Sequence, residues 1–570
     1  MTRTFPRLAV TFAAALAALI LPARADSDMD RKSAALQNLK HIIVVMQENH
    51  SFDNYFGALA YAPGGVHHPV NGHGNGNGQG NNGNGGGNRG GCDPGDHSCV
   101  DGLSCTLAAD GTLACANSNP DDDGSTAVAF HDSNRCPAPD LDHGWVGSHL
   151  EANFANPNAS LRDFRGDGFV LRNDQSEQLD NGVESPTEDE TIGYYNQNDL
   201  PFYYDLAQKF AISDRHFCSV LGPTFPNRSY SLAATSFGHL TTSDELPPGF
   251  DTSTGGYKPL TGTIFDLLDS HAVIWAEYFQ DLPAGGSFRP FVVNLLTGAP
   301  LPGSDPHFAP LATFLQQVSG TPGAAELPQV SFIDPNFGFF NRGAENDEHP
   351  PADIQRGQAF VSQLVNAVRN GPYWKDSIIF ITYDEHGGFY DHVKPPQAPQ
   401  GGARTPDGIE PGQCADASNL PASALAGGGA ECHTNDVDPA DSSVANATQL
   451  CPQFAANPTG PFPPECASFD QLGFRVPFIA VSPFAKPGYV SHNVSDHTSV
   501  LALIEKRFMV PFMRGRQSDD HPHLTRRDQF ADTLEDMFDF ENSPSLNTPV
   551  GTAAPPVNDC GPTSGVSAAP

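Results

Sequence analysis

The stretch IIVVMQEN, residues 42–49, is a run of β-branched and other apolar side chains that ends abruptly in three polar ones. Such an uninterrupted apolar run is typical of a parallel strand that is buried on both faces. The pattern recurs in SIIFITYDE, residues 377–385, and more weakly in VPFIAVSP, residues 476–483. We therefore expect three strands of one buried sheet, two of which end in acidic or amide side chains.

Helical patterns lie between these runs. Residues 200–210 have a proline in the first turn, residues 354–368 have apolar side chains at helical spacing, and residues 500–508 form a third helical segment. Asp496 or Thr498 can cap this third helix. Strands that alternate with helices predict a mainly parallel sheet covered on both faces, so the expected fold class is α/β.

The first 25 residues are typical of a secretory signal. Arg3 and Arg7 precede an apolar run, and small residues follow it at Ala23 and Ala25. The apolar run is too short to cross a bilayer. We therefore expect a secreted or periplasmic protein without a transmembrane anchor.

The remaining chain reads as one interrupted domain. We expect this domain to span residues 38–540, with loop-rich insertions at about 65–136 and 395–466 and a flexible C-terminal tail at 541–570. Residues 71–91 are almost wholly Gly and Asn and have no apolar side chain to bury, which predicts a flexible loop inside the first insertion.

Eleven cysteines in an exported chain predict disulfide bonds, because the compartment outside the cytoplasm is oxidising. Five lie within residues 92–136 and four within 414–466, whereas Cys218 and Cys560 stand apart. No CxxC pair is present, which disfavours a zinc ribbon. The sequence does not determine the connectivity, and the odd count leaves at least one thiol unpaired or joined to another molecule.

The chain is strongly acidic, with a formal net charge of −36 at pH 7. A surface of this sign repels polyanions, so nucleic acid is excluded as an expected partner.

The polar residues after the two strongest strands point to a cation site. Ligand sites in open α/β sheets form beyond the carboxyl ends of strands. Asp384 and Glu385 offer hard oxygen ligands, and the glycines that follow His386 allow the backbone to approach closely. Glu48 and Asn49 end a buried strand, where an acid needs a cation or a cleft. Taken alone, however, this second pair can equally be a helix cap.

Four motifs follow one another along the chain: ENHSFDNYFG (48–57), GPTFPNR (222–228), NDEHPP (346–351) and YDEHGGFYDHV (383–393). In sequence and in order they resemble the bacterial family of phospholipases C and acid phosphatases. Similar segments also occur at residues 138–145 and 495–508. The resemblance spans about residues 38–540, apart from the insertions.

This resemblance implies a fold similar to the alkaline phosphatase superfamily, in which a hydroxyl side chain and acidic residues hold metal and the hydroxyl attacks phosphorus. By resemblance, Glu48, Asn49, Asp384 and Glu385 are metal ligands, and Thr224 is both a ligand and the nucleophile. Taken alone, Thr224 is a turn residue between two prolines. A threonine hydroxyl is a weak nucleophile, so the metal must lower its pKa. The identity of the divalent metal stays open, because oxygen ligands suit Mg²⁺, Ca²⁺ or Mn²⁺, whereas related folds often use zinc with more histidines.

Two histidines resemble the active-site histidines of the family. His143 and His349 can bind phosphoryl oxygens or protonate the leaving group, and which of them is the acid stays open. For His386, His392 and His497 we expect supporting contacts to the site. Arg228 can be an anion clamp or a salt-bridge partner.

The resemblance implies an exported, metal-dependent hydrolase of phosphate esters. We predict a phospholipase C that cleaves phosphatidylcholine-type lipids to diacylglycerol and a phosphorylated headgroup through a phosphothreonine at Thr224. The alternative within the family is an acid phosphatase acting on monoesters, and a different class is a binding or adhesion module without turnover. A sulfatase is disfavoured because its modified Cys or Ser motif is absent around Thr224. Phospholipids or other phosphate esters are the expected partners, with transient contact to a membrane surface, and the acidic surface favours zwitterionic lipid.

Overall fold

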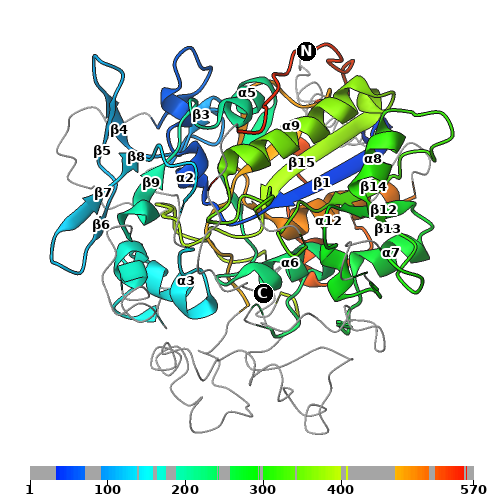
Figure 1. Ribbon diagram of the computed structural model, residues 1–570, viewed down its shortest axis with the longest axis horizontal. Coiled ribbons are helices and arrows are strands. Elements are labelled where there is room, and N and C mark those ends of the chain that lie inside the picture. The colour runs from blue at the N-terminus through cyan, green and yellow to red at the C-terminus, as the bar shows by residue number, and fades with distance from the viewer. Residues whose placement is uncertain are drawn as a thin grey trace, which may run out of the picture.

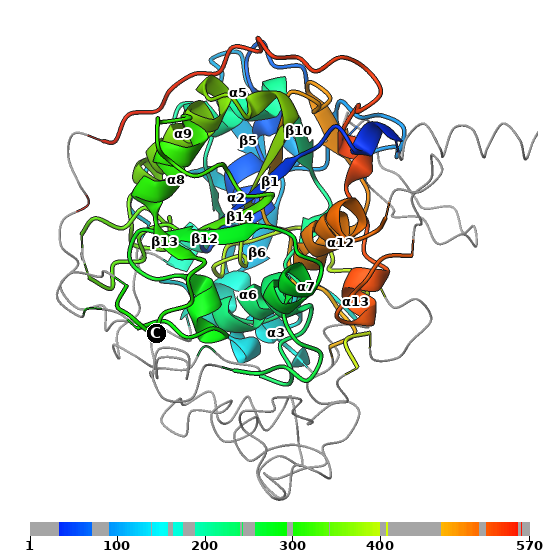
Figure 2. The same ribbon diagram turned by 90° about the vertical axis from the view of Figure 1, so that its right-hand side faces the viewer.

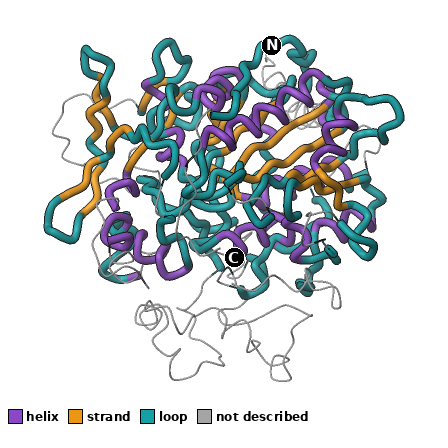
Figure 3. Tube along the Cα trace, in the orientation of Figure 1, coloured by secondary structure: helices purple, strands orange, loops and turns teal. Residues whose placement is uncertain are grey.

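A computed structural model defines the fold, which Figures 1 and 3 show from one side. The predicted signal, the Gly/Asn-rich loop and the four cysteines of the second insertion lie outside the described residues. The structure describes residues 34–70, 91–137, 140–157, 163–174, 188–239, 242, 257–292, 294, 300–340, 343–399, 406–408, 469–511, 520–556 and 560.

An eight-stranded sheet forms the centre of the molecule, in the order β13-β12-β14-β1-β15-β16-β10-β17. All neighbouring strands pair in parallel except at β16, which is antiparallel to both of its neighbours. The predicted α/β class with a mainly parallel sheet is therefore confirmed. The strands are β1 (His41–Gln47), β10 (Ala211–Ser213), β12 (Trp275–Phe279), β13 (Phe308–Pro310), β14 (Val330–Ile333), β15 (Ser377–Tyr383), β16 (Phe478–Val481) and β17 (Tyr489–Ser491).

The two strands that carry polar ends are adjacent at the middle of the sheet. β1 and β15 pair over their whole length, and their last residues, Gln47 and Tyr383, are directly opposite each other. The chain therefore leaves both strands at the same edge, which places Glu48 beside Asp384. Because β16 runs in the opposite direction, its carboxyl end lies at the other edge of the sheet.

Helices cover both faces of the sheet, as Figure 2 shows, with α5, α8 and α9 on one side and α6, α7 and α12 on the other. The three predicted helices are present. The third begins at His497, three residues earlier than expected, and the Asp496 side chain caps it by accepting a hydrogen bond from the backbone N–H of Thr498. The helices are α2 (Phe52–Phe56), α3 (Trp145–Ala152), α5 (Pro201–Lys209), α6 (Thr224–Ala233), α7 (Ile264–Ser270), α8 (Leu311–Val318), α9 (Ile354–Asn370), α12 (His497–Phe508) and α13 (Arg526–Gln529).

Small two-stranded sheets make up the described part of the first insertion, which projects from one end of the molecule (Figure 1). A further short pair, β11 with β18, lies near the central sheet. These strands are β2 (His68–Pro69), β3 (Cys99–Val100), β4 (Cys105–Leu107), β5 (Leu113–Cys115), β6 (Ser118–Pro120), β7 (Thr126–Val128), β8 (Phe130–His131), β9 (Gly193–Tyr194), β11 (His216–Phe217) and β18 (Ser495–Asp496).

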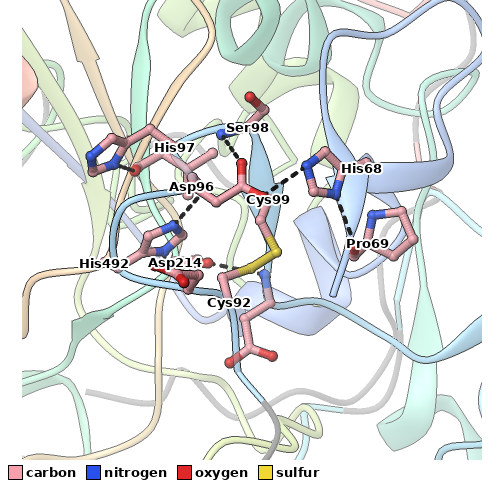
Figure 4. The surroundings of a disulfide bond; sticks show 12 residues. His68, Pro69, Cys92, Asp96, His97, Ser98, Cys99, Asp214 and His492 are labelled. Atoms are coloured by element: carbon pink, nitrogen blue, oxygen red, sulfur yellow. Dashed lines mark hydrogen bonds and ion pairs between the residues drawn. A yellow bond between two sulfur atoms is a disulfide. The ribbon is translucent and has the colours of Figure 1, made fainter. Parts of the chain in front are cut away.

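The predicted disulfide bonds are present in the described residues. Figure 4 shows the bond between Cys92 and Cys99, which closes a short loop beside His492 and Asp214. Cys218 is buried and unpaired, in keeping with the odd cysteine count. The other two bonds join Cys105 to Cys115 and Cys136 to Cys560.

The C-terminal segment is attached to the body at several points. The indole of Trp374 donates to the carbonyl of Leu546 at 3.2 Å, and the guanidinium of Arg369 donates to that of Thr548 at 2.8 Å. The disulfide at Cys560 adds a covalent attachment. Among the described residues, no helix is long and apolar enough to cross a membrane.

Candidate functional site

The four predicted oxygen ligands meet at one edge of the sheet. The backbone N–H of Asn49 donates to the Asp384 carboxylate at 3.2 Å, which ties the ends of β1 and β15 together. Asn49 has a φ of 61°, in the left-handed region that asparagine tolerates better than most residues. The helix-cap alternative for Glu48 and Asn49 is wrong, because the cap of α2 is the side chain of Ser51.

This edge concentrates buried oxygen atoms that lack hydrogen-bond partners. They are Oδ1 of Asn49, Oδ2 of Asp384 and Oε1 of Glu385. Burial and the charge of Glu48 raise the pKa of Asp384 to about 7. Oxygen donors in such an environment fit a hard divalent cation. The residues present therefore suit the predicted metal.

The backbone segments after β1 and β15 pack closely against each other at this edge. Gly387 has a φ of +65°, and a Cβ atom at this position would lie 2.2 Å from the carbonyl oxygen of Asn49. Only glycine accommodates both this conformation and this approach. The glycine after His386 thus allows the two ligand-bearing segments to touch.

The helix α6 carries Arg228 to this edge. Thr224 is the first residue of the helix and lies one turn before Arg228, so both side chains are on the same helix face. The Arg228 guanidinium lies 2.9 Å from Oε1 of Glu48 and 3.6 Å from Oδ2 of Asp384. The salt-bridge interpretation of Arg228 is therefore correct in this structure. The positive end of the α6 dipole lies at Thr224, where it favours negative charge.

The two predicted histidines face each other across an unpredicted carboxylate. The rings of His143 and His349 are 6.1 Å apart, and each ring has a nitrogen 3.7 Å from a carboxylate oxygen of Asp140. His143 also connects to the oxygen cluster, with Nε2 3.8 Å from Glu385 and 3.4 Å from the side-chain amide of Asn49. The sequence signal for Asp140 was its place three residues before His143 in one of the similar segments.

Both histidines favour the charged form. Burial opposes protonation, but the negative charges of Glu385 and Asp140 raise the pKa of His143 to about 9. Burial likewise opposes the charge on His349, and Asp140 together with Glu48 raises its pKa to about 9. Two cationic imidazoles beside the oxygen cluster can bind an anionic group or donate a proton to it.

The triad of Asp140, His143 and His349 has the composition of a metal site, since one ligand atom from each lies within 4.8 Å of the others. Nδ1 of His143, however, lies 2.7 Å from the carbonyl oxygen of Leu141 and is engaged as a donor to it. The ring nitrogen nearest Asp140 is therefore not free to bind a cation. This engagement argues against a second metal at the triad.

The three remaining histidines have different surroundings. His386 lies 3.3 Å from the Glu385 carboxylate, which is the expected supporting contact. Nε2 of His497 lies 2.9 Å from the carbonyl oxygen of Tyr383, at the end of β15. His392 instead lies 2.6 Å from Asp53, within a separate network of buried ion pairs.

The mainly parallel sheet thus gathers carboxylates and two histidines at one edge. The model of the Phosphoesterase family matches residues 39–511, and the chain belongs to this family. Its curated relatives include phospholipases C.

The relatives differ in how much of each chain is matched. A non-specific phospholipase C of Arabidopsis thaliana is 29% identical over 365 residues, which are 62% of this chain and 54% of the relative. The chain thus spans about half the length of that plant protein. Phospholipase C A of Mycobacterium tuberculosis is 27% identical over 549 residues, which cover 92% of this chain and 83% of the relative. Among solved structures, murine ectonucleotide pyrophosphatase/phosphodiesterase 5 matches with a TM-score of 0.25 and 10% identity, covering 56% of this chain and 92% of that one.

Proposed function

We propose that this chain is an exported, metal-dependent phosphoric ester hydrolase, and specifically a phospholipase C. The observation that carries the proposal is the convergence of buried oxygens that accept no hydrogen bond, from Asn49, Asp384 and Glu385, at the edge that Arg228 reaches. Thr224 begins the helix that carries Arg228. The phospholipases C among the relatives support a phospholipid substrate. The disulfide bonds support an oxidising compartment, and hence secretion or a periplasmic location.

Thr224 acts as the nucleophile in this proposal. Its hydroxyl oxygen forms a bond to phosphorus while the bond from phosphorus to the diacylglycerol oxygen breaks. A divalent cation held by Glu48, Asn49, Asp384, Glu385 and Thr224 itself would favour the ionised hydroxyl and neutralise charge on the phosphoryl oxygens.

The two histidines complete the proton transfers. His143 or His349 gives a proton to the departing diacylglycerol oxygen. Water then attacks the phosphothreonine, loses a proton to the imidazole, and releases the phosphorylated headgroup with Thr224 restored. Both steps need cationic groups around the phosphoryl oxygens, which is the arrangement that the histidines provide.

Two other functions are compared with the proposed phospholipase C. An acid phosphatase would use the same residues on a monoester, and the family resemblance includes such enzymes. A non-catalytic adhesion module would keep the fold without turnover, and it gives no reason for buried oxygens without hydrogen-bond partners to gather at one edge of the sheet.

The test is release of phosphocholine from phosphatidylcholine vesicles by the purified protein. Thr224→Ala removes the nucleophile and should abolish release with little change in folding. The matched control is Thr235→Ala, because the Thr235 hydroxyl contacts Asp407, at 3.2 Å, beyond the end of α6. An unchanged rate in Thr224→Ala would remove the nucleophile assignment. Cleavage of aryl phosphate monoesters alone would support the phosphatase alternative, and no turnover of either substrate would support the binding module.

A further inference from the structure

A fully buried carboxylate lies beneath the candidate site. Glu348 is 0% exposed. Its carboxylate accepts hydrogen bonds from the hydroxyls of Tyr203 at 2.5 Å, Tyr55 at 2.6 Å and Tyr383 at 2.6 Å, and from the side-chain amide of Gln47 at 3.2 Å. Four neutral donors from four separate segments of the chain therefore converge on one acid.

Burial of this carboxylate costs free energy that its hydrogen bonds must offset. A buried carboxylate is disfavoured unless it is paired with a cation or fully hydrogen-bonded, and burial raises the pKa of Glu348 to about 7 although its donors act in the opposite direction. The neighbouring helix also leaves space for it, since a Cβ atom on Gly357 of α9 would lie 2.0 Å from Cγ of Glu348. The site is thus shaped around this side chain.

The backbone at Glu348 is also unusual. Its φ is 76°, in the left-handed region that residues with a Cβ rarely adopt. This turn directs the Glu348 side chain into the core, while the next residue, His349, faces Asp140 at 3.7 Å. The carbonyl oxygen of Glu348 lies 3.0 Å from Nε2 of buried His50, and this contact fixes the peptide bond between Glu348 and His349.

Glu348 and its four hydrogen-bond donors form a network that is joined to the candidate site through the chain at three positions. Three of its members each immediately precede a candidate site residue in the chain, and two of these members end the paired strands β1 and β15 opposite each other. Because β1 and β15 are also held together by their own pairing, movement of the carboxylate would mainly displace His349 relative to the two strand ends. The three pairs are Gln47 with Glu48, Glu348 with His349, and Tyr383 with Asp384.

We propose that Glu348 is a positioning residue that fixes His349 relative to the carboxylates of Glu48 and Asp384. This proposal rests on the proposed function. The Glu348 carboxylate binds Gln47 and Tyr383, so the residues that precede Glu48, His349 and Asp384 are held together. It does not touch the reacting atoms, and it acts through the histidine that does.

The first test is Glu348→Gln, which preserves the shape of the side chain but replaces an accepting oxygen with an NH₂ group that cannot accept a phenol hydrogen. We expect kcat to fall by about 10- to 100-fold, the usual effect of losing a residue that orients a ligand or catalytic group, with a smaller change in KM. Tyr203→Phe removes one donor and should give a smaller loss of kcat. The matched control is Tyr204→Phe on the same helix, because the Tyr204 hydroxyl donates to the carbonyl of Tyr195 instead, at 3.1 Å.

A double-mutant cycle separates positioning from general stability. If Glu348 acts through His349, Glu348→Gln should cause little further loss of kcat in a His349→Ala background. Equal losses in both backgrounds would overturn the proposal. Should Glu348→Gln fail to fold, Tyr203→Phe replaces it in the same cycle.

A readout without turnover separates this proposal from the proposed function. The NMR signals of the His349 imidazole should shift in Glu348→Gln and Tyr203→Phe and stay in place in Tyr204→Phe. An inactive wild-type protein whose His349 signals still respond would refute the proposed function and leave the positioning role standing. Unmoved signals in Glu348→Gln would refute the positioning role whatever the activity.

Discussion

Replacement of Arg475 by methionine tests how much its ion pairs and hydrogen bonds, which join the insertion at about 65–136 to the rest of the domain, contribute to stability. Arg475 is fully buried, with Nε 2.9 Å from the Asp391 carboxylate and Nη2 3.0 Å from that of Asp53. Its Nη1 donates to the backbone carbonyls of Asp101, in the insertion, and Asp214, after β10, at 2.6 and 3.1 Å. Methionine keeps an apolar stem of similar length but has neither the charge nor the donors.

The magnitude follows from what the substitution leaves behind. Removal of one partner of a buried ion pair typically costs about 3–5 kcal/mol, because the other charge stays buried without compensation. Arg475→Met would leave two such carboxylates, but His392 lies 2.6 Å from Asp53 and compensates one of them. The uncompensated group is then Asp391. We expect the free energy of unfolding to fall by about 4 kcal/mol, near the middle of that range.

The assay is urea denaturation followed by the fluorescence of the three tryptophans. Arg475→Met combined with Asp391→Asn should recover part of the loss, since the second change removes the orphaned charge. Arg165→Met is the control, because Arg165 is exposed and pairs with exposed Asp163 at 3.2 Å, and surface ion pairs contribute about 0–1 kcal/mol. A loss below about 1 kcal/mol in Arg475→Met would refute the reasoning, because it would lie in the range of a surface pair.

Three further outcomes are expected. Chelation with EDTA should abolish phosphocholine release, and titration with single divalent ions should restore it and identify the metal; full activity in metal-free protein would contradict the proposed site. The charges of Asp53 and Asp101 outweigh burial and raise the pKa of His392 from its ordinary 6.5 to about 10, so its stabilisation of the fold is complete below pH 6.5 and disappears as the pH rises to 10. The free energy of unfolding of His392→Gln, measured between pH 7 and 10, should therefore fall less steeply than that of the wild type, and parallel curves would contradict this. Loss of the disulfide in a Cys136→Ser/Cys560→Ser variant should lower the free energy of unfolding by about 2–5 kcal/mol in the same assay, and an unchanged midpoint would show that this disulfide adds no stability.

The central strands could be predicted from the sequence because burial on both faces leaves a local record, a run of β-branched side chains. That record has no direction, which is why the antiparallel course of β16 was not predictable from residues 476–483. Disulfide partners such as Cys136 and Cys560 are 424 residues apart, and only the folded chain shows their pairing.

The candidate site divides in the same way. Glu48 and Asp384 follow recognisable strands, so their meeting at one sheet edge could be argued from local patterns. Thr224 could be placed only by family resemblance, because a threonine between prolines has no distinctive signal of its own. Asp140 and Glu348 lie within recognisable segments, but their contacts depend on segments distant in sequence, so their roles could not be read from those segments alone.

The charge balance of the site bears on whether a diester or a monoester is preferred. Arg228 is neutralised by Glu48 at 2.9 Å, and both His143 and His349 face the shared carboxylate of Asp140. Apart from the proposed metal, the two cationic imidazoles share one carboxylate, so we expect the site to favour the single charge of a diester over the two charges of a monoester.

We accordingly expect kcat/KM to be higher for p-nitrophenyl phosphorylcholine than for p-nitrophenyl phosphate. Asp140→Asn removes one negative charge beside both histidines, and it should shift the ratio of the two kcat/KM values toward the monoester. Asp199→Asn is the control for a carboxylate that faces a histidine elsewhere, since Asp199 pairs with the more exposed His131. A wild-type preference for the monoester, or a ratio that Asp140→Asn leaves unchanged, would show that charge at Asp140 does not select the substrate.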